Sequence, residues 1–188
     1  KTAIKNFSNE AVKIYAAGRT DSGVHALGQV VHFDLERQTS ANEIREALNN
    51  HLKPNPIAVI SAEEVSNDFH ARFSALKRHY RYDIINRRPP LTLDKGRYWR
   101  VGKSLDIRLM IEASKYMEGN HDFTTFRSTH CQSKSPIKTI DLIEIEQSGL
   151  EINIFISAKS FLHNQVRSIA GSLKLVGEGK WQSLKIKE

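Results

Sequence analysis

The chain has 188 residues, and its 28 lysines and arginines outnumber its 21 aspartates and glutamates, which gives a formal net charge of +7. No apolar run approaches the roughly 18 residues that a membrane helix needs. The single cysteine, Cys131, excludes an internal disulfide, and the scattered histidines show no zinc-ligand spacing. We therefore expect a cytoplasmic globular protein, without a membrane segment, whose partner is a polyanion.

The whole positive excess lies between residues 77 and 103, a segment that we call the basic strip. It contains two acidic residues, Asp83 and Asp94, and nine basic ones: Lys77, Arg78, Arg81, Arg87, Arg88, Lys95, Arg97, Arg100 and Lys103. Such a strip is either a solvated charged face or a surface that contacts phosphates. Aromatic residues that alternate with the charges favour phosphate contact: Tyr80, Tyr82, Tyr98 and Trp99.

In the first part of the chain, the pattern predicts a strand over 12–17, a strand over 29–35, a helix over 40–51 and a strand over 57–61. Ser40 and Glu43 have the spacing of a capping box, which marks where the helix begins.

Further elements are expected in this order: a strand over 77–86, a helix from Asp106 to Gly119, a hairpin of 138–147 and 150–158, and a helix over 161–176. Alternation in the strand over 77–86 places Tyr80, Tyr82 and Ile84 on one face. Strands and helices follow one another without a strict βαβ rhythm. This order favours an α+β fold with a largely antiparallel sheet.

Residues 17–26, with the sequence Ala-Gly-Arg-Thr-Asp-Ser-Gly-Val-His-Ala, carry the strongest functional signal. Two glycines around Asp21 let the backbone turn tightly beside a ligand. Arg19 can hold an ionised carboxylate or a phosphate. Alone, the Asp-Ser-Gly tripeptide also fits an ordinary turn.

The complete run resembles the signature of the tRNA pseudouridine synthase A family, whose aspartate is the nucleophile. Further blocks agree with that family in order: 71–75 leading to 80–82, 121–127 leading to Cys131 and Gln132, and 161–167. Family members usually begin with a strand and a Tyr-Asp-Gly segment and end with a strand that carries Gly-Leu. Neither is present, so we expect these residues to be part of a longer protein. Gln165 also stands where a methionine is common.

The resemblance implies the pseudouridine synthase fold, a mixed and mostly antiparallel sheet with helices. It implies two RNA-recognition-like (ferredoxin-like) lobes that flank a central cleft. Residues 1–76 would form the N-terminal lobe with the nucleophile motif, and residues 77–188 the C-terminal lobe, within one catalytic domain.

The resemblance also assigns roles to individual residues. Asp21 is the nucleophile, and Arg167 is its ion-pair partner, although an arginine here also fits the polar side of an amphipathic helix. Tyr80 packs against the target base, or else is an ordinary core residue of its strand.

Three further assignments stay open between two interpretations. Arg19 stabilises the flipped-out nucleotide or contacts a backbone phosphate, unless it forms a structural salt bridge. His25 shapes the pocket or is a hydrogen-bonded structural histidine. Arg127 contacts tRNA phosphate or is a surface arginine.

The expected activity is the isomerisation of uridine to pseudouridine in tRNA, in the anticodon stem-loop at about positions 38 to 40, by a homodimer that needs no cofactor. Whether Asp21 attacks ribose C1′, attacks the uracil ring or acts as a base stays open. The rival interpretations are a relative that modifies other RNA positions and a noncatalytic RNA-binding module. A metal-dependent nuclease is disfavoured, because no second carboxylate accompanies Asp21 in its motif.

Overall fold

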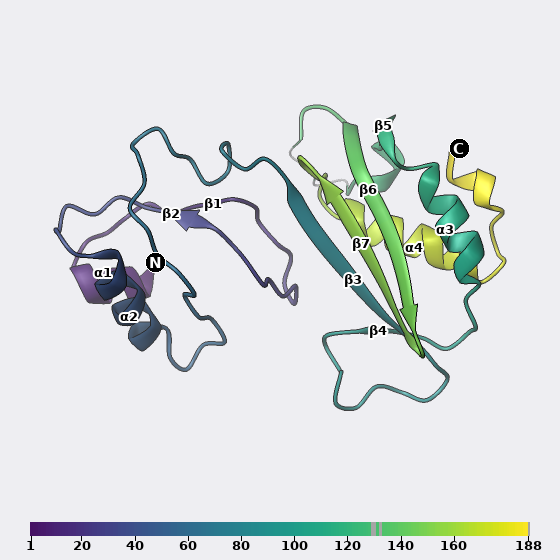
Figure 1. The fold of residues 1–188 in the computed structure, drawn as a ribbon, viewed down its shortest axis with the longest axis horizontal. Coiled ribbons are helices and arrows are strands. Elements are labelled where there is room, and N and C mark those ends of the chain that lie inside the picture. Colours follow the sequence, from purple (N-terminus) through teal and green to yellow (C-terminus); the bar gives the residue numbers. More distant parts are fainter. Residues whose placement is uncertain (129–130, 132, 188) are drawn as a thin grey trace. The chain divides into compact units, whose positions relative to one another are not determined.

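The computed structural model describes residues 1–128, 131 and 133–187, so Gln132 of the family block lies outside the described residues. The chain divides into two compact units, Lys1–Ala75 and Leu76–Glu188. Figure 1 shows the elements of each unit along the chain. The described elements combine four α-helices with a two-stranded and a five-stranded sheet, which confirms the expected α+β class.

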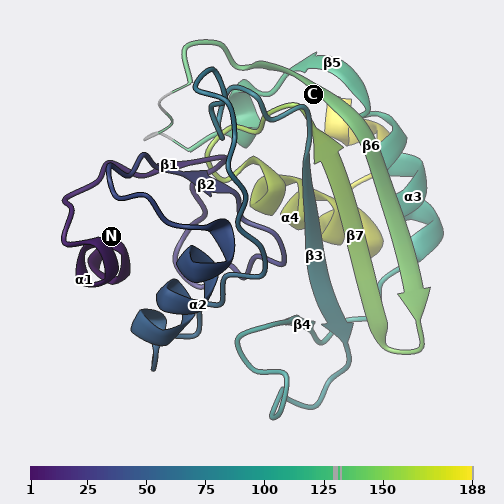
Figure 2. The same cartoon turned by 60° about the vertical axis from the view of Figure 1, so that its left-hand side comes forward.

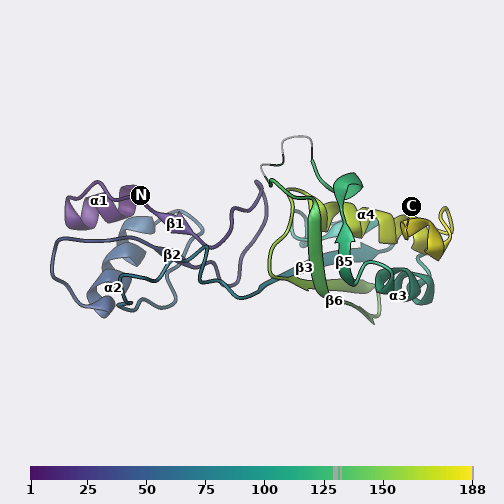
Figure 3. The ribbon, with the colours of Figure 1, turned by 90° about the horizontal axis from the view of Figure 1, so that it is seen from above.

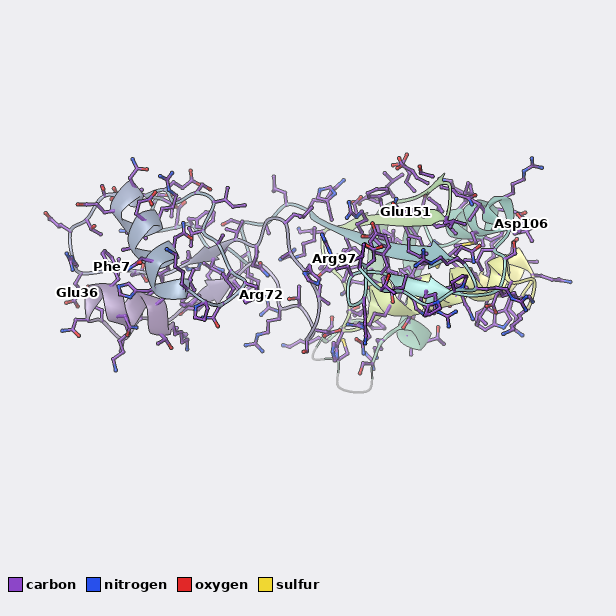
Figure 4. The ribbon with its side chains drawn as sticks, turned by 90° about the horizontal axis from the view of Figure 1, so that it is seen from below. Phe7, Glu36, Arg72, Arg97, Asp106 and Glu151 are labelled. Atoms are coloured by element: carbon purple, nitrogen blue, oxygen red, sulfur yellow. The ribbon has the colours of Figure 1, made fainter. Side chains whose placement is uncertain are left out.

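Unit 1 packs two helices beside a short antiparallel strand pair. Its elements are α1 (Thr2–Ser8), β1 (Tyr15–Ala16), β2 (Val31–His32) and α2 (Ala41–Leu52). Ala3 and Ile4 of α1 meet Leu48 of α2 in a small buried core. The segment after β2 is tied to α1, because the Arg37 guanidinium lies over the Phe7 ring, 5.0 Å from its centroid. Figure 4 labels Phe7 and the neighbouring Glu36.

Helix α2 begins where the capping box predicts. The Glu43 backbone N–H donates to Ser40 Oγ at 3.3 Å, and the Ser40 backbone N–H donates to Glu43 Oε2 at 2.8 Å. These two bonds satisfy backbone donors that the first turn of a helix leaves unpaired. The Ser40–Glu43 prediction is confirmed.

Unit 2 is built on a five-stranded sheet with the order β4-β3-β7-β6-β5, in which only the β3–β4 pair is parallel. The strands are β3 (Arg78–Asn86), β4 (Trp99–Val101), β5 (Gly119–Asp122), β6 (Ile137–Ser148) and β7 (Glu151–Ala158). Helices α3 (Ile107–Lys115) and α4 (Gln165–Gly177) cover one face of this sheet, as Figure 2 shows. Short 3-10 helices are formed by Thr124–Phe126 and Ser183–Lys187.

Side chains that lie opposite one another on the central strands β3 and β7 form the sheet side of the core of unit 2. Ile84 of β3 lies opposite Ile152 of β7, Tyr82 opposite Ile154, and Tyr80 opposite Ile156. The three β7 isoleucines and Ile84 are buried, whereas the two tyrosines are partly exposed. The predicted shared face of Tyr80, Tyr82 and Ile84 is confirmed, and Tyr80 lies at its more exposed end. Figure 3 shows α4 lying along the sheet.

Several expected boundaries are wrong, and the contacts give the reasons. No strand forms over 57–61, because the Asn49 side chain occupies both backbone groups of Val59: Val59 N donates to Oδ1 at 2.7 Å, and Nδ2 donates to Val59 O at 2.9 Å. The strands expected over 12–17 and 29–35 pair at only two residues each. The last helix begins at Gln165 rather than at 161, because Asn164 before it is left-handed at φ 65°.

Candidate active site

The loop that carries Arg19, Asp21 and His25 joins β1 to β2 in unit 1. Its base is closed by Ala17 N, which donates to Val30 O at 2.9 Å. Gln29 Nε2 adds a second closure by donating to Gly18 O at 2.8 Å. Below these bonds the Tyr15 and His32 rings stack, with centroids 4.8 Å apart. The loop therefore leaves a fixed pair of strands and is held shut at its base.

Asp21 is the first residue of a tight turn. Val24 N donates to Asp21 O at 3.2 Å, and Gly23 has φ 81°. A positive φ at the third position of a four-residue turn is the feature of a type II turn, and glycine adopts it without the steric cost of a Cβ. The ordinary-turn interpretation and the nucleophile interpretation of this tripeptide are therefore compatible. The turn sets the direction in which the carboxylate leaves the backbone.

Residues of this loop differ in exposure. Asp21 is partly buried, whereas Arg19 and His25 are exposed. An exposed arginine two residues from a partly buried carboxylate is available to an anionic ligand.

In unit 2, the Tyr80 ring is fixed by an aromatic neighbour. Phe161 lies edge-on to it, with ring centroids 5.1 Å apart and an interplanar angle of 85°. Phe161 belongs to the segment that joins β7 to α4, so the contact connects the start of β3 with the entrance to that helix. Edge-to-face geometry is one of the arrangements that aromatic rings prefer.

The segment around Arg127 is hydrogen-bonded to the segment that joins β7 to α4. Ser128 N donates to His163 O at 3.1 Å, two residues beyond Phe161. The pKa of the Cys131 thiol is lowered: burial acts to raise it, but backbone hydrogen bonds at His163 and Ser133 and the charge of Arg127 outweigh that effect. Arg127 itself is exposed.

Helix α4 begins in an unusual way. Its N-cap, Asn164, makes no side-chain cap bond, and the fully buried Gln165 instead accepts from Leu162 N at 2.8 Å through Oε1. Arg167 lies in the first turn, where no acidic residue stands. A helix N-terminus favours negative charge, so an arginine there adds to the local positive potential instead of stabilising the helix. This end of α4 is therefore attractive to an anion.

The structure brings three predicted site residues together at one end of unit 2. Tyr80 contacts Phe161 of the 159–164 connection, and Ser128, next to Arg127, donates a hydrogen bond to His163 of the same connection. Arg167 lies in the first turn of α4, directly after that connection. Arg19, Asp21 and His25 belong to unit 1. Sequence patterns assigned no role to Phe161 or Gln29. Phe161 opens the family block at 161–167, which is the one signal that singles it out.

Among the described residues, no group of three or more histidine, cysteine, aspartate or glutamate side chains is arranged to hold a metal ion. Within the same part of the chain, no helix combines the length and the apolar character needed to cross a bilayer.

Comparison with known proteins gives consistent matches. A family model described as tRNA pseudouridine synthase matches residues 1–74 and 113–188. A protein named tRNA pseudouridine synthase A from Parvibaculum lavamentivorans is 54% identical over 185 residues, which cover 98% of this chain and 75% of that protein. Proteins of the same name from Maricaulis maris and Rhodopseudomonas palustris are 54% and 55% identical, over 96% and 92% of this chain and 73% and 70% of their own lengths. The resemblance seen in the sequence motifs is confirmed.

Proposed function

The chain belongs to the tRNA pseudouridine synthase family, and we propose that it isomerises uridine in the anticodon stem-loop of tRNA with Asp21 as the nucleophile. Membership implies conversion of uridine to pseudouridine in tRNA, an isomerisation. Resemblance to the family supports the stem-loop, at about positions 38 to 40, as the target. The observation that carries the role of Asp21 is its place at the head of the Asp21–Val24 turn, inside the matched range 1–74.

The reaction rearranges bonds without a net change in composition. The bond from ribose C1′ to uracil N1 breaks, the base rotates, and a bond from C1′ to C5 forms. The proton on C5 leaves, and N1 takes up a proton. No electrons are exchanged with another molecule, so the reaction has no redox requirement. The carboxylate of Asp21 is the proposed nucleophile, whether its first attack is on C1′ or on the uracil ring.

Arg167 is proposed as the ion-pair partner of Asp21, because a guanidinium and a carboxylate form charge-assisted hydrogen bonds. The position of Arg167 in the first turn of α4 supports the proposal, because the helix terminus reinforces its positive potential.

Tyr80 is proposed to stack on the flipped uracil, and its partly exposed ring, in edge-to-face contact with Phe161, supports this. One base–aromatic contact contributes about 1–3 kcal/mol. Arg19 is proposed to hold the extruded nucleotide or its phosphate, His25 to shape the pocket, and Arg127 to contact tRNA phosphate.

The remaining parts of the proposal rest on the family. Residues 1–76 and 77–188 are proposed as its two RNA-recognition-like lobes, which flank the catalytic cleft. The active form is proposed to be a cytoplasmic homodimer that contacts one tRNA with both subunits. Light scattering at assay concentration tests the dimer, and a monomer mass for active protein would contradict it.

The catalytic role is tested with tRNA tritiated at uracil C5, because the proton on that carbon must leave. Wild-type protein is expected to release tritium, and Asp21→Asn, which removes the charge and keeps the shape, is expected to release none while binding tRNA as before. Asp34→Asn, an exposed aspartate of unit 1, is the matched control and should retain full release.

Other outcomes identify the rivals. Release that persists in Asp21→Asn removes Asp21 from the mechanism. Tight tRNA binding without release by the wild type supports the noncatalytic binding module. Mapping pseudouridine in the product decides whether the stem-loop positions or others are modified.

A further inference from the structure

A depression lined by cationic side chains lies where β3 ends and β4 meets the following loop. Its lining residues are Asn86, Arg87, Arg88, Arg100, Gly102, Lys103 and Ser104. Four of these seven are arginine or lysine, and none is acidic. All four belong to the basic strip, and they lie between the two ranges that the family model matches. We call this feature the β3–β4 depression.

Three of the four cations of the depression donate to backbone carbonyls rather than to carboxylates. The contacts are Arg87 Nη2 to Pro90 O at 3.0 Å, Arg100 Nη1 to Arg88 O at 2.6 Å and Lys103 Nζ to Glu178 O at 2.7 Å. A neutral acceptor orients a cation but leaves its charge uncompensated. Elsewhere in the strip, by contrast, Lys77 pairs with Asp141 and Arg81 with Asp83.

The depression is held in shape by the Asn86 side chain. Its Nδ2 donates to Val101 O at 2.9 Å and to Lys103 O at 2.6 Å, and its Oδ1 accepts from Leu105 N at 3.1 Å. Because one amide binds three points of the 101–105 segment, the backbone that carries Lys103 is fixed before any ligand arrives.

Gly102 is the one lining residue without a side chain. A Cβ at this position would stand 3.3 Å from Arg100 Nη1, which is a tight contact. The guanidinium therefore lies over the backbone of Gly102, where a larger side chain would displace it.

One donor of the depression has no partner among the described residues: Arg87 Nε is buried and makes no hydrogen bond. A buried donor left unpaired costs roughly 1–3 kcal/mol, so such a group in a native structure calls for an explanation.

We propose that the β3–β4 depression binds a phosphate group of the RNA backbone. Arginine and lysine donors that converge without a carboxylate match the charge and the several acceptor oxygens of a phosphate. That the phosphate belongs to a tRNA rests on the proposed function. Asn86 and Tyr80 are six residues apart on β3, which is about 20 Å along the strand. The bound phosphate therefore lies several nucleotides from the target uridine and adds affinity without reading sequence.

The test measures binding of a fluorescent anticodon stem-loop RNA to the full chain over a range of salt concentrations. In Arg88→Gln/Arg100→Gln, the slope of log affinity against log salt is expected to fall by about 0.7–0.9 for each phosphate that the variant no longer neutralises. Lys5→Gln/Lys53→Gln removes the same charge from exposed positions of unit 1 and is expected to change the slope less. Gly102→Val keeps every charge but fills the depression, and it should also weaken binding.

A double variant whose slope matches that of the lysine control would overturn the proposal, as would wild-type affinity in Gly102→Val. Thermal melting of each variant shows whether it is folded, and Gly102→Val carries the test if the double variant is not. Tritium release by the wild type is measured in parallel. If it fails while the depression variants still show a reduced slope, the catalytic proposal falls and the phosphate site stands.

Discussion

Phe161 lies edge-on to Tyr80, at 5.1 Å between ring centroids, and a second aromatic pair repeats this arrangement one step along the same strand face. There Trp99 lies edge-on to Tyr82, at 5.9 Å and an interplanar angle of 83°. The two pairs have similar geometry, but their second rings come from different parts of unit 2. Phe161 comes from the connection that leads to Arg167, whereas Trp99 comes from β4.

Replacing Phe161 by leucine is expected to lower kcat/KM for pseudouridine formation by about threefold to tenfold. An edge-to-face pair contributes about 0.5–1.5 kcal/mol beyond its buried area, and here it holds the ring that is proposed to stack on uracil. The measurement is tritium release at subsaturating tRNA.

Trp99→Leu is the matched control, because it removes the same kind of contact from Tyr82. It is expected to lower the melting temperature to a similar extent but to change kcat/KM less than Phe161→Leu does. Equal losses of activity in the two variants would show that Phe161 acts only through general stability.

Local sequence signals predicted those parts of the fold that local chemistry decides. Alternation along β3 placed Tyr80 and Ile84 on the core face, since side chains of a strand alternate regardless of what packs on them. Ser40 and Glu43 marked the start of α2, because a capping box needs only residues three apart.

Features that depend on distant residues were not predictable from the pattern. Val59 lies in an apolar stretch, but the Asn49 side chain, ten residues earlier, takes the hydrogen bonds that a strand needs. The β3–β4 depression likewise requires Arg88 and Arg100 to meet through strand pairing. The sequence shows the charges of the basic strip, but it does not show which of these charges are paired with carboxylates.

Gly23→Ala is expected to reduce tritium release at least severalfold with little change in the global stability of the chain. The backbone at Gly23 has φ 81°, a conformation that costs an L-residue roughly 1–2 kcal/mol. Because the hydrogen bond that closes this turn is accepted by the backbone carbonyl of Asp21, relaxation of the strain shifts the carboxylate. Single-turnover release and thermal melting are measured on the same preparation.

Gly28→Ala serves as its control, because Gly28 lies in the same loop, has no positive φ and would place its Cβ in open space. Full activity is expected in this variant. A loss as large as that of Gly23→Ala would attribute the effect to stiffening of the loop rather than to the turn.

Asp106→Ala is expected to lower the free energy of unfolding by about 1 kcal/mol, the usual cost of losing an N-cap. Asp106 Oδ1 accepts from Arg108 N at 2.9 Å and from Leu109 N at 3.2 Å at the start of α3. Urea denaturation measures the change. Asp106→Asn keeps an acceptor of the same shape and should restore most of the stability; a loss equal to that of alanine would assign the effect to charge instead.

Glu178 gives the structure a specific pH dependence. Its side chain is only 5% exposed and lies between Lys174 Nζ at 2.8 Å and Lys180 Nζ at 2.9 Å. Hydrogen bonds from these two lysines outweigh desolvation and lower the pKa of the Glu178 carboxyl from its ordinary value of 4.5. A lowered pKa in the folded state means that ionised Glu178 stabilises the fold above about pH 4.5, and that this contribution is lost as the pH falls through the folded-state pKa.

Glu178→Gln should therefore be less stable than the wild type at pH 7, and the difference should shrink steadily as the pH is lowered below about 4.5. Urea denaturation at a series of pH values measures it, with Glu112→Gln on the exposed side of α3 as the control for loss of one charge. A difference that stays constant down to about pH 3 would mean that Glu178 stabilises the end of α4 by packing alone. High salt should reduce the difference at neutral pH only in part, because a carboxylate this buried is incompletely screened.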